Sequence, residues 1–506
     1  MPDVHSLLER TCQWERETAL LESTQATLEW DERTGMPLDA GAYRAEQITY
    51  LSGLIHQRRT DIAQADRISQ LAELALPEPS DSDLAVTARY LQRNLLRRQK
   101  LPLDLVQATT KAIVLGQQAW SLARKAQSFR DFLPHLEAIV KLKRQEANLL
   151  AINGSAYNGL LDEYEEGADE RQLQILFADL RNKLVPVVAE AAEATKRRGP
   201  IFQQPKLAIA EQRPFNQFVA AKIGFDFKAG RLDETDHPFC TTLGPKDCRI
   251  LTRYFESDLL SSLFSTLHEA GHGMYEQGLP AEHFGLPLGS YASLGIHESQ
   301  SRLWENAVGR SLPFWQWCTP QLQQQFGAAF DNVTAEDIYR YTNAVAPSLI
   351  RVEADEATYN LHIAIRFELE QKLISGYLEP KDLPEAWKAG YRDYLGIEPS
   401  NHAEGCLQDV HWSAGLFGYF PTYTIGNLIA AQWMESVQNA LGDLAALHRG
   451  GNFQPLLQWL RTNVHRHGKR FSPIGLVELI SGRPLSAEPF LNYLRAKLRD
   501  TGILAE

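Results

Sequence analysis

The chain of 506 residues has an ordinary globular composition, with 44% hydrophobic and 23% charged residues. Its formal net charge of −12 leaves no surplus of basic side chains to neutralise phosphates, which disfavours binding to nucleic acid. No apolar run approaches the ~18 residues of a membrane span, and the first residues lack the pattern of a signal peptide. We therefore expect a cytoplasmic protein that does not bind membranes. Five cysteines without a CxxC pair indicate reduced thiols rather than disulfides or a structural zinc site.

Helical periodicity dominates the first 198 residues. We expect amphipathic helices over 4–33, 40–77, 82–100, 103–127, 131–152 and 169–198. Pro102, Pro134 and Asp169 are typical of helix starts. This part of the chain (1–198) is predicted to be an N-terminal helical layer.

Prolines interrupt the pattern between residues 199 and 254, where Leu207–Ala210 and Arg249–Tyr254 alternate like strands. Helices resume at residue 257 and continue to the end, including a long pattern from Ala335 to Ser375 with Pro347 as a kink or boundary. The sequence predicts a single large unit (1–506), mainly helical (all-α), with a small β element near a catalytic half formed by 199–506.

Residues 268–272 read His-Glu-Ala-Gly-His, the pattern HExxH. On a helix, positions i and i+4 lie on one face, so His268 and His272 can reach one zinc ion, with Glu269 beside its open position. The pair Ser257-Asp258 is suited to cap the start of this helix. The alternative is a coincidental pair of histidines on a helix surface.

A third metal ligand is needed, because catalytic zinc takes three protein ligands and keeps one position open. We expect this ligand to be Glu298, 26 residues after His272, on a second helix that starts near Ser293. Arg302 stands at i+4 from Glu298 and can orient its carboxylate. The alternative is an ordinary helix ion pair, worth a few tenths of a kcal/mol.

Glu269 is then the predicted general base, which assists the attack of zinc-bound water on the scissile carbonyl and afterwards protonates the leaving amine. The tetrahedral oxyanion needs hydrogen-bond donors besides the metal. Candidates are His411, Tyr419 and Tyr423, each of which is also compatible with a structural role.

Six motifs in order along the chain resemble those of the carboxypeptidase Taq family of zinc metallocarboxypeptidases, also called thermostable carboxypeptidases. They are HPF at 237–239, the start of DxRxT at 247–250, HExxH at 268–272, HESQ at 297–300, IRxxAD at 350–355 and GxxQDxHW at 405–412. One departure is Leu251, which stands where the family's DxRxT ends in threonine, although Thr252 follows. The departure concerns a local hydroxyl contact and not the metal ligands.

The resemblance implies a helical fold with a deep substrate groove, the zincin-type HExxH helix at its floor and the 1–198 layer as one wall. It implies one zinc ion per chain, with cobalt as an activating substitute, and a homodimer. The implied reaction is release of single C-terminal amino acids from peptides with a free C-terminus. Specificity would be broad, commonly excluding proline.

An exopeptidase must bind a free carboxylate, and the planar guanidinium of arginine can do so through two parallel hydrogen bonds. Arg351 is the first choice, because it lies in a family motif and on the long helix expected to line the groove. Arg249 is the second choice. The alternative for Arg351 is an ion pair with an acidic residue close in sequence: Glu353, Asp355 or Glu356.

The motifs contain further residues with open roles. His297 adjoins the third ligand and can bind the substrate carbonyl or pack beside the site. His237 can bind substrate or support the groove wall. Asp355 can fix the tautomer of a ligand histidine. His411 and Tyr423 are preferred over these for oxyanion stabilisation.

Two other functions compete with a carboxypeptidase. A zinc oligopeptidase or dipeptidase would use the same metal chemistry, and a blocked C-terminus distinguishes it. A non-catalytic homologue would only bind peptides. The intact set of His268, Glu269, His272 and Glu298 argues against that second alternative.

Overall fold

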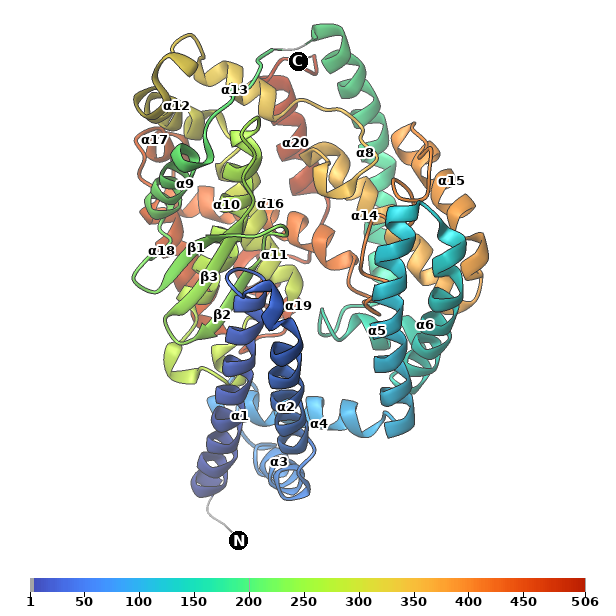
Figure 1. The fold of residues 1–506 in the computed structure, drawn as a ribbon. Helices are drawn as coiled ribbons and strands as arrows, with labels where there is room; N and C mark the ends of the chain where they lie inside the picture. The colour runs from blue at the N-terminus through green and yellow to red at the C-terminus, as the bar shows by residue number, and fades with distance from the viewer. Residues whose placement is uncertain (1–3, 200, 506) are drawn as a thin grey trace.

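A computed structural model describes residues 4–199 and 201–505 (Figure 1). The first eight helices are α1 (Val4–Glu32), α2 (Gly41–Arg59), α3 (Ile62–Leu74), α4 (Asp83–Gln99), α5 (Leu103–Ala126), α6 (Phe129–Leu149), α7 (Ala156–Leu161) and α8 (Glu170–Arg198). The predicted helix over 40–77 is wrong in extent, because the chain breaks at Thr60 and Asp61 caps a new helix. Asp169 caps α8 as predicted, whereas Pro134 lies inside α6 rather than at its start.

The middle of the chain forms α9 (Ile209–Ile223) and the strands β1 (Gly230–Glu234), β2 (Cys240–Gly244) and β3 (Asp247–Thr252). The strand order is β1-β3-β2, with β1 parallel and β2 antiparallel to β3. The predicted strand at Leu207–Ala210 is wrong, since α9 begins at Ile209. The small β element itself is confirmed, and it packs against the helix that carries HExxH.

The remaining helices are α10 (Leu259–Gly278), α11 (Leu294–Arg302), α12 (Leu312–Phe326), α13 (Ala335–Thr342), α14 (Glu356–Ser375), α15 (Leu383–Leu395), α16 (Pro421–Leu441), α17 (Leu444–Arg449), α18 (Gln454–Asn463), α19 (Pro473–Ser481) and α20 (Glu488–Asp500). A π-helical turn over Leu303–Val308 continues α11. The long pattern over 335–375 is two helices, and a 3-10 turn over Arg351–Glu353 precedes the second. Arg351 therefore does not lie on a long helix.

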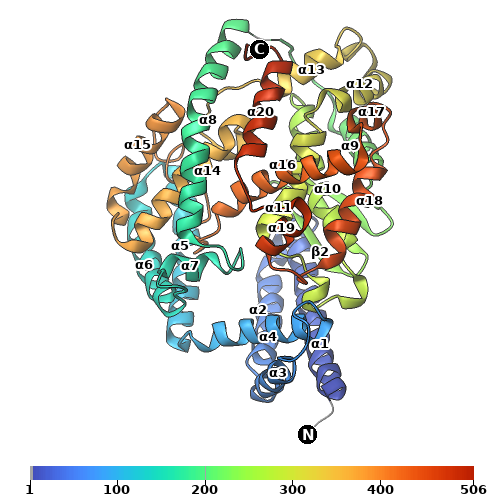
Figure 2. The same cartoon turned by 180° about the vertical axis from the view of Figure 1, so that it is seen from behind.

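Two groups of helices lie on opposite sides of the molecule in the ribbon views (Figures 1 and 2). Helices α5, α6, α8, α14 and α15 form one side, and the sheet with α9, α10, α12 and α13 forms the other. Residue 198 is not the boundary between the sides, because α14 packs against α6 and α8 while α1 packs against β2. One continuous hydrophobic core extends from Ala123 to Ile503.

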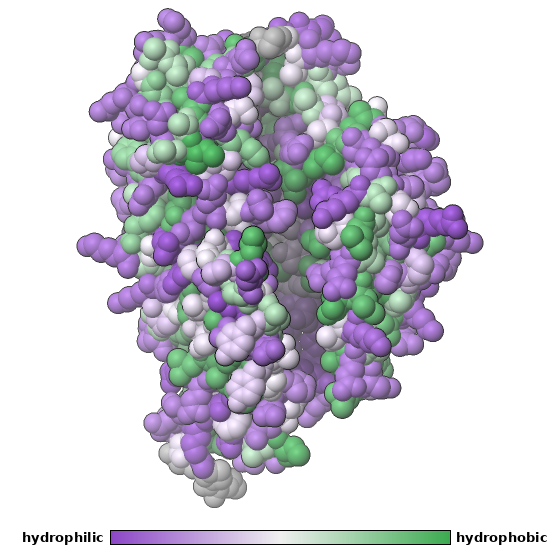
Figure 3. Space-filling model, in the orientation of Figure 1, coloured by the Kyte–Doolittle hydropathy of each residue, from purple (hydrophilic) through white to green (hydrophobic). Residues whose placement is uncertain are grey.

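The surface is hollowed between the two sides, as Figure 3 shows, and hydrophilic residues gather along the lower part of this hollow. Within the described residues, every helix is too short or too polar to cross a membrane.

Candidate metal centre

Helix α10 carries the HExxH residues, and glycines on α10 and α16 let the neighbouring helices pack closely around Glu298. Asp258 caps the helix by accepting a hydrogen bond from the Ser261 amide at 3.0 Å. A Cβ added at Gly271 would lie 2.6 Å from Ser301 Cα of α11, and one added at Gly426 of α16 would lie 2.7 Å from the Glu298 side chain. Glycine at these two positions allows α10, α11 and α16 to converge on Glu298.

His268, His272 and Glu298 form a cluster whose ligand atoms all lie within 4.8 Å of one another. Glu298 Oε2 is 3.7 Å from His268 Nε2 and 3.5 Å from His272 Nε2. Ligands at zinc–nitrogen and zinc–oxygen distances of about 2.0–2.1 Å in a tetrahedron stand roughly 3.4 Å apart. The spacing and the His₂Glu donor set therefore fit a divalent metal such as zinc.

Glu305 contacts the ring nitrogen of His268 that faces away from the cluster, with Oε2 2.9 Å from His268 Nδ1. Glu305 sits on the π-helical turn after α11 and also accepts hydrogen bonds from Arg302 and Arg310, each at 3.2 Å. Ligand histidines commonly donate their second ring nitrogen to a carboxylate in this way. The contact orients His268 with Nε2 toward the cluster.

His272 has a histidine as its outer partner. Its Nδ1 lies 2.5 Å from His297 Nδ1, and His297 Nε2 lies 3.0 Å from Glu276 Oε1. The second carboxylate oxygen of Glu276 accepts a hydrogen bond from Thr242 of β2 at 2.9 Å. Burial, together with the neighbouring His297, lowers the pKa of His272 to about 3, so the ring is neutral as a metal ligand requires.

Glu298 divides its two oxygens between the cluster and Arg302. Arg302 Nε donates to Oε1 at 2.7 Å, which leaves Oε2 facing both histidines. Burial opposes ionisation, but Arg302, His268 and His272 hold the pKa of Glu298 well below its usual range. The sequence-based expectation that Arg302 orients Glu298 matches this geometry.

Glu269 lines a cavity of about 730 Å³ together with the three cluster residues. The cavity is also bounded by α1, β2 and α16, through Ser23, Thr242 and Tyr423 among others. Burial raises the pKa of Glu269 to about 7. A carboxyl group with this pKa beside a metal cluster is suited to accept and return a proton near neutral pH.

Tyr423 and His411 lie together near this cavity. Tyr423 lines it, and its hydroxyl is 3.0 Å from His411 Nε2. Burial lowers the pKa of His411 to about 3, so the ring is neutral. Tyr419 also lines the cavity, with its ring 5.4 Å from that of Tyr423. The three residues predicted as oxyanion donors are thus neighbours of one another.

Arg351 is 6% exposed and belongs to a buried charge cluster. Its Nε and Nη2 lie 2.9 Å from Asp409 Oδ1, and its Nη1 donates to Tyr359 at 3.0 Å. Arg366 donates to the other oxygen of Asp409 at 2.6 Å. Burial opposes ionisation, but Arg351 and Arg366 hold the pKa of Asp409 well below its usual range. The guanidinium lies 5.0 Å from the Tyr423 ring centre, next to the cavity rather than in its lining.

Three other predicted residues lie elsewhere. Arg249 pairs with Asp247 at 2.9 Å on β3, and the exposed His237 precedes the lining residue Pro238 without lining the cavity itself. Asp355 is not the partner of a ligand histidine, because it caps α14 and accepts from the Ala346, Ala357 and Thr358 amides. The histidine partners are Glu305 and His297 instead.

Sequence reasoning missed Glu305 and Glu276. Glu276 continues the i, i+4 series of His268 and His272 along one helix face, which is a readable signal. Glu305 follows Arg302 by three residues, but its approach to His268 depends on the π-helical turn. Sequence periodicity contains no signal for that turn.

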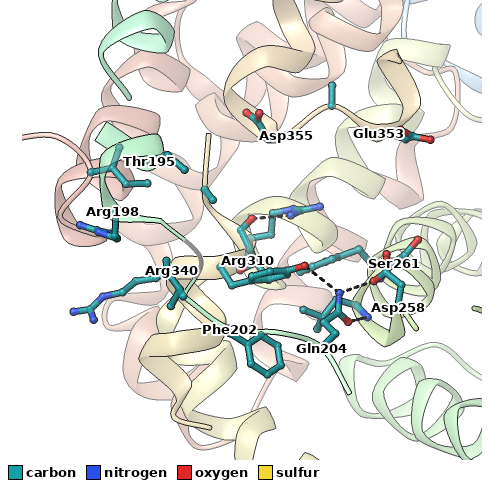
Figure 4. Close-up of a pocket in the computed structure, with 18 of the residues that line it drawn as sticks. Thr195, Arg198, Phe202, Gln204, Asp258, Ser261, Arg310, Arg340, Glu353 and Asp355 are labelled. Carbon is teal, nitrogen blue, oxygen red and sulfur yellow. Dashed lines mark hydrogen bonds between the residues drawn. The ribbon is translucent and has the colours of Figure 1, made fainter. Parts of the chain in front are cut away.

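A second cavity, of about 590 Å³, lies at the start of α10. Figure 4 shows Gln204 joined to Asp258 on its wall, with Arg310 between them and Asp355. None of the metal-cluster residues lines it. Arg310 nevertheless connects it to the centre, because its Nη2 donates to Glu305.

Comparison with known proteins identifies the family of this chain. The family model described as carboxypeptidase Taq (M32) metallopeptidase matches residues 10–498. Thermostable carboxypeptidase 1 of Thermus thermophilus is 43% identical over 96% of this chain and 97% of that protein. Carboxypeptidase 1 of Bacillus subtilis is 36% identical over 95% of each chain. The crystal structure of the M32 carboxypeptidase from Deinococcus radiodurans, 38% identical, superposes with a TM-score of 0.92 over 98% of this chain and 99% of that one. The chain therefore belongs to the carboxypeptidase Taq (M32) family and is a metallocarboxypeptidase.

Proposed function

We propose that this metallocarboxypeptidase holds one zinc ion through His268, His272 and Glu298 and releases single amino acids from the free C-terminus of peptides. The observation that carries the proposal is the cluster of three ligand atoms within 4.8 Å in the wall of the groove cavity. Glu305, His297 and Arg302 fix one ligand each, as expected of a preformed metal site.

Zinc is the proposed metal because two imidazoles and one carboxylate are a typical donor set of catalytic zinc, and cobalt is the proposed substitute. When bound, the ion would polarise the scissile carbonyl and acidify a water molecule. Glu269 takes the proton of the attacking water and transfers it to the leaving nitrogen. Its place in the cavity wall beside both ligand histidines supports this role.

Tyr423 and His411 are the proposed donors to the oxyanion. Because His411 is neutral, one of its ring nitrogens accepts a hydrogen bond and the other can donate one. The Tyr423 hydroxyl can donate to the developing negative charge while it stays in contact with His411. Tyr419 is proposed to contact substrate from the same wall.

Arg351 is the proposed site for the terminal carboxylate. Its hydrogen bonds to Asp409 and Tyr359 use Nε and one N–H of Nη1, and Nη2 forms an ion pair with Asp409, so at least one N–H on each Nη nitrogen remains. Two arginines, Arg351 and Arg366, share the single charge of Asp409, so the buried cluster carries a net positive charge that complements an anion. Arg249, paired with Asp247 on β3, is the alternative.

Broad specificity, with proline excluded as the terminal residue, is part of the proposal. So are a homodimer and a cytoplasmic location, both of which follow from the family resemblance and the sequence. His237 is retained as a contributor to substrate binding through its position beside Pro238, whereas His297, in the cavity wall, is assigned to positioning His272.

One experiment tests the class and direction of the reaction together. Free-acid and C-terminally amidated peptides are incubated with metal-free and zinc-loaded protein, and the products are read by mass spectrometry. Stepwise loss of C-terminal residues from the free acids only, and only with metal, is the expected result. Internal cleavage, or equal cleavage of amidated peptides, would establish the oligopeptidase alternative. Inactivity with a full complement of zinc would establish the non-catalytic one.

A further inference from the structure

We propose that Cys240 and Cys248 form a dithiol modification site in the wall of the groove, which peroxide closes to a disulfide and trivalent arsenicals bridge. The two sulfur atoms lie 3.6 Å apart on the neighbouring strands β2 and β3. The other three cysteines, Cys12, Cys318 and Cys406, are buried single thiols. A pair of facing thiols is a chemical feature that the peptidase reaction does not use.

The strand register explains why the two thiols meet. Cys240 pairs with Ile250 and Thr242 pairs with Cys248, so the cysteines are diagonal neighbours on one face of the antiparallel pair. The ladder is irregular between Thr242 and Gly244, next to Cys248 on the partner strand. A bulge increases the local twist, and twist brings diagonal side chains closer. The 3.6 Å separation is within reach of a bond after a small movement of the strands.

The two thiols differ in access. Cys240 is partly exposed and lines the same cavity as Glu269, whereas Cys248 is 2% exposed beneath it. The hydrogen bond with Cys248, burial and the nearby carboxylates raise the pKa of Cys240, so Cys240 rests as a thiol. Cys240 is therefore the thiol that meets a small oxidant from the groove, and Cys248 is the one that closes the bond.

The oxidation uses one hydrogen peroxide molecule per pair. Cys240 sulfur attacks a peroxide oxygen, the O–O bond breaks, and water leaves with the thiol proton, which gives a sulfenic acid. Cys248 sulfur then attacks Cys240 sulfur, the S–O bond breaks, and a second water leaves with the Cys248 proton. The two thiols supply the two electrons that reduce the peroxide to two molecules of water.

Closure changes the groove wall because a disulfide requires the sulfurs to lie about 2.05 Å apart. The two sulfurs must approach each other by about 1.5 Å, through rotation of both side chains and adjustment of β2 on β3. Thr242 on β2 is hydrogen-bonded to Glu276, the partner of His297. Cys248 Sγ also contacts the Gly273 carbonyl at 3.8 Å, one residue after His272. We expect kcat/KM to fall about tenfold, since displacements of ~1 Å near a catalytic site cost up to 10²-fold.

The test treats zinc-loaded protein with excess hydrogen peroxide, alkylates the remaining thiols and maps the peptides by mass. The expected result is a Cys240–Cys248 cross-link and a loss of activity on the same time course. Dithiothreitol should remove the cross-link and restore the activity. Cys248→Ala should instead stop at a sulfenic acid on Cys240 that dimedone traps. Cys318→Ala, which removes a buried single thiol of α12, is the matched control and should cross-link like the wild type.

Phenylarsine oxide provides a second readout that involves no oxidation. It condenses with two thiols, forming two As–S bonds and releasing one water, so one adduct per chain is expected in the wild type. Neither Cys240→Ser nor Cys248→Ala should form this adduct. Two fully alkylated thiols after peroxide, or unchanged activity in the cross-linked protein, would overturn the proposal.

Discussion

The Nδ1 atoms of His272 and His297 lie 2.5 Å apart, with the two rings stacked at a centroid distance of 4.4 Å. Only one of the two nitrogens can carry the proton between them. His297 Nε2 faces the Glu276 carboxylate and is its donor, so His297 Nδ1 is the acceptor and His272 Nδ1 carries the proton. The remaining lone pair of His272 is then on Nε2, facing the cluster. Both ring nitrogens of His297 are occupied, which favours a positioning role over contact with a substrate carbonyl.

Replacing His297 should weaken metal binding. His297→Phe keeps a stacked ring but removes the acceptor for His272, and loss of such an outer partner typically costs 10–100-fold in metal affinity. Competition with a chromophoric chelator measures the zinc dissociation constant directly. His135→Phe on α6, far from the cluster in sequence, is the control and should leave it unchanged. An unaltered zinc affinity in His297→Phe would exclude the positioning role.

Metal removal should lower the unfolding temperature. An ion that binds only the folded chain stabilises it by about 4 kcal/mol at a free concentration of 1,000 times its Kd. For a chain of this length, with an unfolding entropy of roughly 1 kcal/mol per kelvin, this is a shift of about 4 °C. Calorimetry with and without a chelator measures the shift, and His268→Ala should abolish it. Identical midpoints for metal-free and zinc-loaded wild type would contradict the ligand assignment.

Tyr423→Phe should lower kcat while KM stays nearly constant. Removal of one oxyanion donor typically costs about 10²–10³ in kcat, and a contact made only in the transition state does not change substrate affinity. Steady-state kinetics on one free-acid peptide provides both constants. His411→Asn should cause a smaller loss in the same constant, because it removes the partner of the hydroxyl and not the hydroxyl. A rise in KM with kcat intact would assign Tyr423 to ground-state binding.

Arg351→Ala should remove the preference for free-acid over amidated peptides. The guanidinium is the proposed partner of the terminal carboxylate, which amidated peptides lack. Arg351→Lys keeps the charge beside Asp409 but not the planar fork, so an intermediate loss is expected. Arg249→Ala is the matched comparison and should retain the preference. Equal losses of kcat/KM on both peptide types in Arg351→Ala would contradict the assignment of Arg351 to the terminal carboxylate.

The metal cluster was the part of the site that the sequence predicted best, because its residues lie close together along the chain. His268 and His272 are one helical turn apart, and Glu298 lies on the next helix of the chain. The helices predicted around them also hold, since Asp258 and Ser293 cap α10 and α11 as their sequences indicate. The HExxH spacing, helix caps and hydrophobic periodicity were therefore sufficient to predict the metal ligands and the two helices that carry them.

The contacts that sequence reasoning missed join residues far apart in the chain. The alternative considered for Arg351 was an ion pair with acids close in sequence, but its partner Asp409 is 58 residues away and lies on the buried loop before α16. Periodicity also gave no sign that α14, far along the chain, returns to pack against α6 and α8. Such pairings depend on the path of the chain in space, which periodicity does not record.

Glu370 should make the protein less stable as the pH rises toward neutrality. This buried carboxyl of α14 accepts hydrogen bonds from Tyr157, Trp412 and the Gly418 amide. Burial nevertheless raises its pKa from 4.5 to about 7. Between these values the unfolded chain releases the proton and the folded chain retains it, so the free energy of unfolding falls with pH and levels off above pH 7.

The contribution of Glu370 to stability can be isolated by comparing how the unfolding midpoints of the wild type and Glu370→Gln change with pH. The raised pKa corresponds to about 3 kcal/mol, or about 3 °C in the unfolding midpoint of a chain this long. Glu370→Gln cannot ionise, so its midpoint should gain about 3 °C relative to the wild type between pH 5 and pH 8. Because Glu370→Gln also loses one carboxyl oxygen as a hydrogen-bond acceptor, its midpoint should in addition be shifted by the same amount at every pH. Glu385→Gln, which alters a side chain that is 80% exposed, should show no such trend. Parallel curves for wild type and Glu370→Gln would mean that Glu370 is already ionised in the folded protein at pH 5.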